Sequence, residues 1–170
     1  MPITKAILTD TVELTKLVNS AYRGESSQKG WTTEAHLLDG IRIDEPTMAG
    51  YLQADDDIVL KYTNNEGQII ACVYLQQQKQ KLYLGMLTVS PTLQANGIGR
   101  QLLHEAEKIA HNLNCSMIFM TVITTRHELI NWYERRGYLR TEKIEPFASI
   151  PKRFGEPKEE IEMVVLEKEI

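Results

Sequence analysis

The chain has 170 residues, of which 42% are hydrophobic and 25% are charged, and its formal net charge at pH 7 is -4. These values are typical of a globular chain with a packed core, so we expect residues 1–170 to form a single domain and exclude wholesale disorder. The acidic balance differs from that of chains that bind a phosphate backbone, so we predict no nucleic-acid partner, although a local basic patch stays open.

Two further features concern the compartment of the protein. The cysteines, Cys72 and Cys115, cannot form a disulfide framework, and both lie in apolar stretches where a cysteine is usually a small buried hydrophobe. The N-terminal stretch carries Asp10 and Glu13, unlike a signal peptide, and the apolar runs are too short to cross a bilayer. We therefore expect a reduced, cytoplasmic setting and no membrane partner.

The chain begins with the pattern of a strand and a helix. Residues 3–8 are expected to form a short strand. Asp10 and Glu13 have the spacing of a capping box, and they precede an apolar stripe at helical spacing that ends near Gly24.

The next stretch is harder to interpret until a hairpin appears. Residues 32–40 predict a second short helix that stops at Gly40, whereas residues 41–53 show no clear pattern. The β-rich runs 58–62 and 68–75 flank an Asn-Asn-Glu-Gly turn, so they predict a hairpin.

The second half alternates strands and helices, which predicts an α/β arrangement around one core. The expected order is strand, helix, strand, helix, strand, strand, at residues 82–89, 99–113, 115–123, 128–136, 138–144 and 160–166. The run 115–123 is almost wholly apolar, so we expect a strand that is buried on both faces. Gly137 suits a left-handed cap at the end of the second of these helices.

Residues 94–100, Gln-Ala-Asn-Gly-Ile-Gly-Arg, join the strand 82–89 to the helix that follows it. The two glycines permit positive φ angles, and the start of a helix carries a partial positive charge, so this loop can direct its amides at a pyrophosphate. Arg100 can add a charged contact. A Walker loop needs Gly-Lys-Ser/Thr and a dinucleotide fingerprint needs a third small residue, and the loop has neither. An ordinary glycine-bearing turn before a helix stays open as the alternative.

The pattern Gln-x-x-Gly-x-Gly resembles the coenzyme A pyrophosphate loop of the Gcn5-related N-acetyltransferase (GNAT) superfamily. The segment from Asn131 to Tyr138 resembles the helix-to-strand segment of the same superfamily, and the likeness runs from about Leu82 to Tyr138. It implies an α/β fold (α+β in some schemes) in which the whole chain is one GNAT domain. The expected mixed sheet has about six to seven strands, is flanked by about four helices, and is splayed between the strands Leu82–Val89 and Cys115–Ile123.

The resemblance also implies acetyl-CoA as co-substrate and transfer of its acetyl group to a primary amine of a small molecule or peptide. The residues expected to contact the coenzyme are Leu87, Thr88, Val89, Gln94, Ala95, Asn96, Gly97, Ile98, Gly99 and Arg100. Arg126 stands where the superfamily commonly has an asparagine that contacts the coenzyme. Whether Arg126 contacts a phosphate, contacts an acidic group on the acceptor or is simply solvated stays open.

Tyr133 matches the superfamily position of the residue that gives a proton to the departing thiolate, a role that a phenol can perform because it is protonated at neutral pH. The alternative is a core residue on the apolar stripe of its helix, and we assign Trp132 and Tyr138 to packing. The general base is undetermined between Glu25, Glu34, Glu128 and a water chain. Candidates for the acceptor site are Trp31, Glu34 and Arg42, with Phe147 and Phe154 as walls.

The remaining expectations concern metals, partners and rival functions. The four histidines do not cluster and no HExxH motif exists, so we predict no metal. The net charge mildly favours a cationic acceptor. A homodimer is the common arrangement for such chains, and the oligomeric state stays open. The rivals to an enzyme are a non-catalytic acyl-CoA-binding or regulatory module and an interaction protein on the same scaffold.

Overall fold

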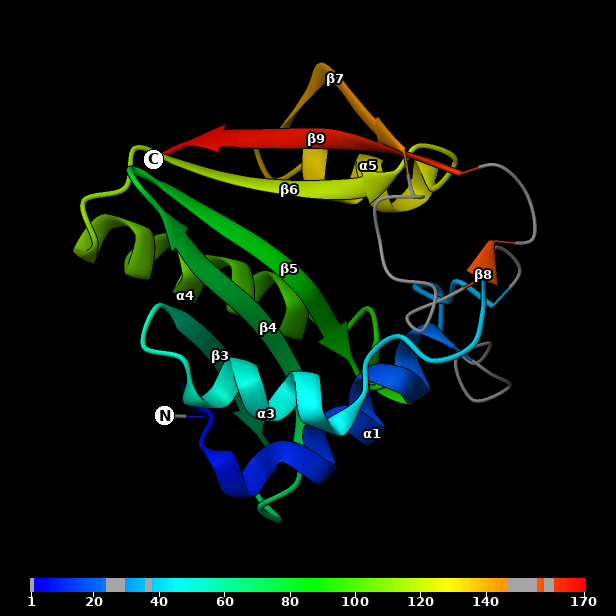
Figure 1. Cartoon of the computed structure of the whole chain (residues 1–170), viewed down its shortest axis with the longest axis vertical. Helices are drawn as coiled ribbons and strands as arrows, with labels where there is room; N and C mark the ends of the chain where they lie inside the picture. Colours follow the sequence, from blue (N-terminus) through cyan, green and yellow to red (C-terminus); the bar gives the residue numbers. More distant parts are fainter. Residues whose placement is uncertain (1, 24–29, 36–37, 147–155, 158–160) are drawn as a thin grey trace.

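The computed structural model describes residues 2–23, 30–35, 38–146, 156–157 and 161–170, and its centre is a seven-stranded mixed sheet (Figure 1). In spatial order the strands are β1 (Ile3–Lys5), β3 (Asp57–Thr63), β4 (Ile69–Gln78), β5 (Lys81–Val89), β6 (Met117–Ile123), β9 (Glu162–Glu169) and β7 (Leu139–Pro146). A separate two-stranded sheet pairs β2 (Leu38–Asp39) with β8 (Glu156–Pro157).

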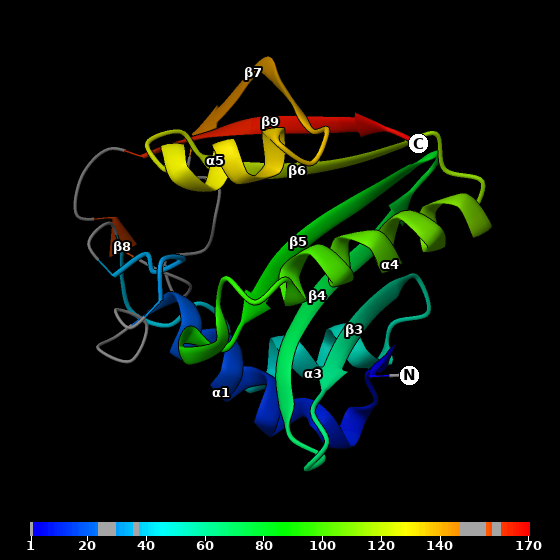
Figure 2. The ribbon, with the colours of Figure 1, turned by 180° about the vertical axis from the view of Figure 1, so that it is seen from behind.

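Four α-helices lie within the described ranges: α1 (Thr11–Tyr22), α3 (Glu45–Gln53), α4 (Ile98–Asn112) and α5 (His127–Glu134). Two short 3-10 helices, η1 (Leu8–Asp10) and η2 (Pro91–Leu93), precede α1 and α4. The helices α1 and α3 lie on one face of the sheet, whereas α4 and α5 lie on the other, as the two opposite views show (Figures 1 and 2). The prediction of an α/β fold with a mixed sheet and about four helices is confirmed.

The sheet opens between β5 and β6, which are the only parallel neighbours among the described strands. β5 and β6 pair through Lys81–Met117, Leu82–Ile118 and Tyr83–Phe119, and they diverge beyond that point (Figure 2). A bulge adds to the bend of β5, because the β4–β5 register shifts between Cys72 and Tyr74 and Met86 has a φ of 55°. The predicted splay between these two strands is therefore confirmed, and it leaves one edge of β5 without a strand partner.

Two hydrophobic cores occupy the two faces of the sheet, because successive side chains of a strand point to opposite faces. Along β4, Val73 and Leu75 join the core under α4 and α5, whereas Cys72 and Tyr74 join the core under α1 and α3. Cys72 and Cys115 are both buried free thiols, as predicted, and burial raises the pKa of Cys72 to about 12. No helix of the described ranges is long and apolar enough to span a membrane.

The helix predicted over residues 32–40 is wrong. Residues 30–35 contain no helix, and residues 38–39 form β2. The amides of this segment have acceptors elsewhere in the chain: those of Trp31 and Thr32 donate to the Gln94 side chain, and that of Glu34 donates to the Tyr22 carbonyl. These contacts replace the local hydrogen bonds that a helix would need.

The stretch 41–53, which showed no clear pattern, contains α3. Asp44 caps this helix, since its carboxylate accepts from the Thr47 amide at 2.8 Å, and Pro46 occupies the first turn. Both are signals of a helix start that the sequence contains.

Two other local predictions need correction. The helix α1 begins beside Asp10 as expected, but the predicted capping box is wrong. The carboxylate of Asp10 accepts from Ile7 N and Lys61 Nζ instead, and that of Glu13 accepts from Ile69 N. The strand at 115–123, predicted to be buried on both faces, is β6, and it is buried on one face only. The helices α1 and α3 cover β3, β4 and β5, and the core beneath these two helices includes no residue of β6.

Removal of the hydroxyl group from two buried tyrosines should change stability in opposite directions. The hydroxyl of Tyr138 has no hydrogen-bond partner among the described residues, whereas that of Tyr74 donates to Asp57 Oδ1 at 2.9 Å. An unpaired buried hydroxyl costs free energy, so Tyr138→Phe should raise the free energy of unfolding by about 1 kcal/mol, and Tyr74→Phe should lower it by about 1 kcal/mol. Denaturant titration of both variants measures the difference. Equal destabilisation by the two substitutions would show that the Tyr138 hydroxyl has a partner such as a buried water.

Candidate active site

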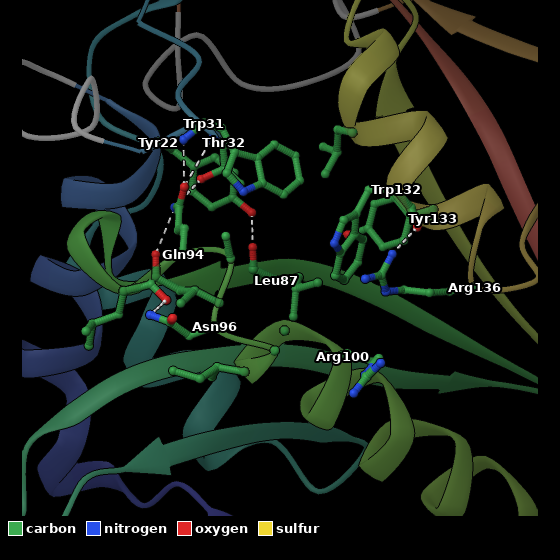
Figure 3. Close-up of a pocket in the computed structure, with 17 residues that line it drawn as sticks. Tyr22, Trp31, Thr32, Leu87, Gln94, Asn96, Arg100, Trp132, Tyr133 and Arg136 are labelled. Carbon is green, nitrogen blue, oxygen red and sulfur yellow. Dashed lines mark hydrogen bonds between the residues drawn. The ribbon is translucent and has the colours of Figure 1, made fainter.

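A cavity of about 440 Å³ lies against the open edge of β5, and we call it the loop-side cavity (Figure 3). It contains most of the residues that the sequence predicted to contact a coenzyme, together with Tyr133 and Trp31. Its described lining is Tyr22, Trp31, Thr32, Leu87, Val89, Leu93, Gln94, Ala95, Asn96, Gly97, Ile98, Gly99, Arg100, Leu129, Trp132, Tyr133 and Arg136.

A second cavity of about 150 Å³ adjoins the first, and we call it the strand-side cavity. Residues of β5 and β6 form much of its wall, and the charged side chains of Arg23, Glu34, Arg42 and Arg126 also line it. The residues that line both cavities are Tyr22, Leu87, Leu129 and Tyr133. The two cavities therefore meet at a narrow set of side chains in the mouth of the splayed sheet.

The loop of residues 94–100 has the backbone that an anion site requires. Gly97 has a φ of 80°, and the first bond of α4 runs from Gln101 N to Gly97 O. The amides of Ile98, Gly99 and Arg100 precede that bond, so they have no main-chain acceptor among the described residues. Ile98, Gly99 and Arg100 line the loop-side cavity, where the helix dipole adds a positive potential.

The two glycines of the loop have different surroundings. A Cβ at Gly97 would meet no atom within 4 Å, so this position opens into free space. A Cβ at Gly99 would lie 3.4 Å from the ring of Trp132, which is an ordinary van der Waals contact, so Gly99 packs beside this ring. Trp132, which the sequence assigned to packing, thus also forms part of the cavity wall.

Gln94 has a role that its position in the motif did not predict. Its Oε1 accepts from the amides of Trp31 and Thr32 at 2.7 and 3.3 Å, and its Nε2 donates to Thr32 Oγ1 at 2.6 Å and to Val89 O at 3.0 Å (Figure 3). The side chain is therefore fully engaged in holding the segment 30–32 against the end of β5. A direct contact from this amide group to an anion would cost some of these bonds.

Arg136 was missed by the sequence analysis, although it lies just beyond α5, the helix whose tyrosine was singled out. Its guanidinium carbon lies 3.8 Å from the centroid of the Trp132 ring, and its Nη1 donates to Trp132 O at 2.7 Å. Its buried Nε has no partner among the described residues, and burial lowers its pKa from the ordinary value. With the exposed side chain of Arg100, it gives the loop-side cavity two guanidinium groups.

Tyr22 and Tyr133 lie between the two cavities and line both of them. Burial raises the pKa of Tyr133 well above its ordinary value of 10, and its hydroxyl forms no hydrogen bond with a described residue. Burial also raises the pKa of Tyr22 to about 12, and its hydroxyl donates to the carbonyl of Leu87 (Figure 3). Both phenols are thus protonated at neutral pH. The sequence offered no signal for Tyr22 beyond its place on the apolar stripe of α1.

Arg126 lies on the strand side rather than beside the loop. Its Nη1 is 3.4 Å from Glu34 Oε2, and its Nη2 donates to Thr32 O at 2.6 Å. Glu34 Oε1 is 3.0 Å from Arg23 Nη2, so the carboxylate is held between two guanidinium groups. Thr88 lines neither cavity, because its main chain pairs with Cys72 on β4 and its hydroxyl donates to Met86 O.

The remaining candidates from the sequence fall in three places. Trp31 lines the loop-side cavity, and Arg42 lines the strand-side cavity. Glu128 is exposed and lines neither of them. Glu25, Phe147 and Phe154 lie outside the described residues. Within the described ranges, no group of three or more His, Cys, Asp or Glu side chains could hold a metal ion.

The arrangement matches a known class of proteins. The profile of the acetyltransferase (GNAT) family matches residues 13–138, which is more than half of the chain. The chain therefore belongs to the GNAT acetyltransferase family. A comparison with curated proteins found no match.

Solved structures with the same fold are related at low sequence identity. The ribosomal-protein-S18-alanine N-acetyltransferase of Escherichia coli is 18% identical with a TM-score of 0.72, and the match covers 99% of this chain and 92% of that chain. The PaiA N-acetyltransferase of Thermoplasma acidophilum, solved in complex with coenzyme A, is 17% identical with a TM-score of 0.72, covering 99% and 98%. A GNAT acetyltransferase of Streptococcus pneumoniae is 23% identical with a TM-score of 0.70, covering 99% and 98%. These likenesses establish the fold.

The contacts of Gln94 predict that its loss loosens the segment 30–32. Gln94→Leu should lower the free energy of unfolding by about 1–3 kcal/mol, because two amides and two acceptors lose their partner. It should also speed amide hydrogen exchange in residues 30–35. Denaturant titration and exchange followed by mass spectrometry measure the two effects.

Asn96→Ala is the matched control, since the exposed Asn96 side chain makes a single bond to Leu93 O in the same loop. Its effect on stability should stay within about 0.5 kcal/mol. If the two variants behave alike, Gln94 does not hold the segment.

Proposed function

We propose that this protein transfers the acetyl group of acetyl-CoA to a primary amine of a small molecule or peptide, with both substrates bound together. The observation that carries the proposal is the position of Tyr133 between two adjoining cavities. One of these cavities is lined by residues 98–100, whose amides have no main-chain acceptor in the described part of the chain. The membership in the GNAT acetyltransferase family supports the same reaction class.

The residues of the loop-side cavity fit the diphosphate of coenzyme A. The amides of Ile98, Gly99 and Arg100 provide directed donors, and Arg100 and Arg136 provide charge. The buried Nε of Arg136, which lacks a partner among the described residues, is a further donor on this wall. We assign the phosphate contacts to these groups, and we assign Gln94 to holding the neighbouring segment in place.

The open edge of β5 fits the remainder of the coenzyme. The carbonyls of Leu87 and Val89 on this edge accept from Tyr22 and Gln94. In a strand, the N–H and C=O of one residue point to the same edge, so the Leu87 amide also faces the gap. We propose that this amide stabilises the negative charge that develops on the carbonyl oxygen of the acetyl group.

Bound acetyl-CoA supplies an activated acetyl thioester with a thiolate as its leaving group. In the reaction a C–N bond forms and the C–S bond breaks, while one proton leaves the amine and another reaches the sulfur. Tyr133 holds its proton on Oη at neutral pH, as a phenol ordinarily does, and burial raises its pKa further. We propose that it donates this proton to the departing sulfur.

The amine must be neutral when it attacks. Glu34 is an unsuitable base, since both of its oxygens face guanidinium groups and protonation would weaken two ion pairs. We propose instead that water removes the proton. The positive charge of the strand-side cavity assists this step, because it disfavours a protonated amine.

The proton donor predicts a specific loss of turnover. Tyr133→Phe should lower kcat several-fold and leave the affinity for acetyl-CoA unchanged, because the phenol acts only on the leaving group. Thiol release with a panel of primary amines measures turnover, and calorimetry measures the affinity.

Tyr138→Phe is the matched control, because it removes a hydroxyl that lines neither cavity. It should leave both quantities unchanged. Unaltered turnover in Tyr133→Phe would make Tyr133 a structural residue, and absence of thiol release in the wild-type protein with every amine would favour a non-catalytic binding module.

The loop predicts a loss of coenzyme binding through charge. Gly97→Glu should abolish binding of acetyl-CoA, because its carboxylate would repel the diphosphate beside the amides of α4. Gly97→Ala imposes the same backbone strain of about 1 kcal/mol without a charge, and it should retain measurable binding. Calorimetric titration of both variants, after their melting temperatures are compared, tests this expectation. A normal titration of Gly97→Glu would refute the phosphate site.

A further inference from the structure

We propose that the amine acceptor carries a carboxylate group, which Arg42 binds in the strand-side cavity. This inference rests on the proposed function and names the substrate class of the same site. The charged groups among the described residues that line the cavity are three arginines and one glutamate, an excess of two positive charges. The cavity is thus cationic although the whole chain carries a net charge of -4.

Glu34 uses its charge within the protein. Its carboxylate pairs with Arg23 at 3.0 Å and with Arg126 at 3.4 Å, and all three residues are buried. Each of the two arginines also donates to a main-chain carbonyl, Arg23 to Ile41 O at 3.1 Å and Arg126 to Thr32 O at 2.6 Å. This buried triad is internally satisfied, and it presents no free acidic group that could bind a second cationic centre.

Arg42 differs from the other two arginines. Its guanidinium forms no ion pair or hydrogen bond with a described residue, and it lies 5.7 Å from the centroid of the Tyr22 ring. A partly buried guanidinium with free donors is suited to bidentate binding of a carboxylate.

The backbone beneath Arg42 is held in place by α1. The amides of Arg42 and Ile43 donate to Asn19 Oδ1 at 2.8 and 3.1 Å, and Asn19 Nδ2 donates to Ile43 O at 2.9 Å. This arrangement orients the residue before a ligand binds, which lowers the entropic cost of binding.

Tyr22 links the proposed carboxylate position to the reaction site. Its ring lies beneath Arg42 and lines both cavities, and its hydroxyl bonds to the carbonyl of Leu87. A carboxylate on Arg42 would therefore direct the rest of the acceptor along this wall toward Tyr133. The cavity volume of about 150 Å³ matches a small molecule with the dimensions of an amino acid, and its charge disfavours polyamines.

The test uses amine pairs that differ by a carboxylate: glycine and glycinamide, β-alanine and β-alaninamide, and L-lysine and cadaverine. At saturating acetyl-CoA, thiol release should give a kcat/KM about tenfold or more higher for at least one carboxylate member than for its partner. Arg42→Gln should remove this preference by raising KM for the carboxylate member far more than KM for its neutral partner. Arg140→Gln, on an exposed position of β7, is the control and should change neither.

A second set of acceptors distinguishes a small carboxylate-bearing amine from a peptide with an acidic side chain. The dipeptide amides Gly-Glu-NH₂ and Gly-Gln-NH₂ differ only in an acidic side chain, and a preference confined to this pair would overturn the assignment to a small acceptor. Equal rates within every pair, equal losses for both members in Arg42→Gln, or no acetylation of any carboxylate member would overturn the inference itself. Thiol release with the neutral amines, together with titration of the wild-type protein with acetyl-CoA, judges the proposed function separately, because neither measurement depends on a carboxylate in the acceptor.

Discussion

The early separation of β5 from β6 is the constraint on which the rest of the structure depends. Two parallel strands that stayed paired would satisfy each other's backbone groups and leave no space between them. Here the pairing stops at Tyr83–Phe119, and the bulge at Met86 bends β5 away. The open edge of β5 then exposes main-chain groups to two cavities, and side chains from α1, α4 and α5 complete their walls.

The same opening explains why aromatic side chains gather in the mouth of the sheet. Tyr133 stacks edge-on against Trp132 and Tyr138, and Trp31 lies 6.3 Å from Trp132. Large rings fill a widening gap with few rotatable bonds, so they form a rigid wall. Burial in this wall raises the pKa of Tyr133 further above its ordinary value of 10, which is already high enough to keep the phenol protonated at neutral pH.

The charge of each cavity differs in sign from the net charge of the whole chain. The chain carries a net charge of -4, yet the loop-side cavity has Arg100 and Arg136 and the strand-side cavity has an excess of arginine over glutamate. The expectation of a cationic acceptor came from the whole-chain charge, which does not describe one cavity. The proposed carboxylate-bearing acceptor follows instead from the partners that each arginine has in the folded chain.

Periodicity and turn chemistry in the sequence predicted most elements and the loop of residues 94–100, because these depend on neighbours within a few residues. The family resemblance implied the splay and the choice of Tyr133. The sequence could not show the pairing of Arg126 with Glu34, the bonds from Gln94 to Trp31 and Thr32, or the freedom of Arg42 from ion pairs with described residues. The incorrect prediction of a helix over residues 32–40 has the same cause. In each case the outcome is decided by contacts between segments up to 94 residues apart, which form only when the chain has folded.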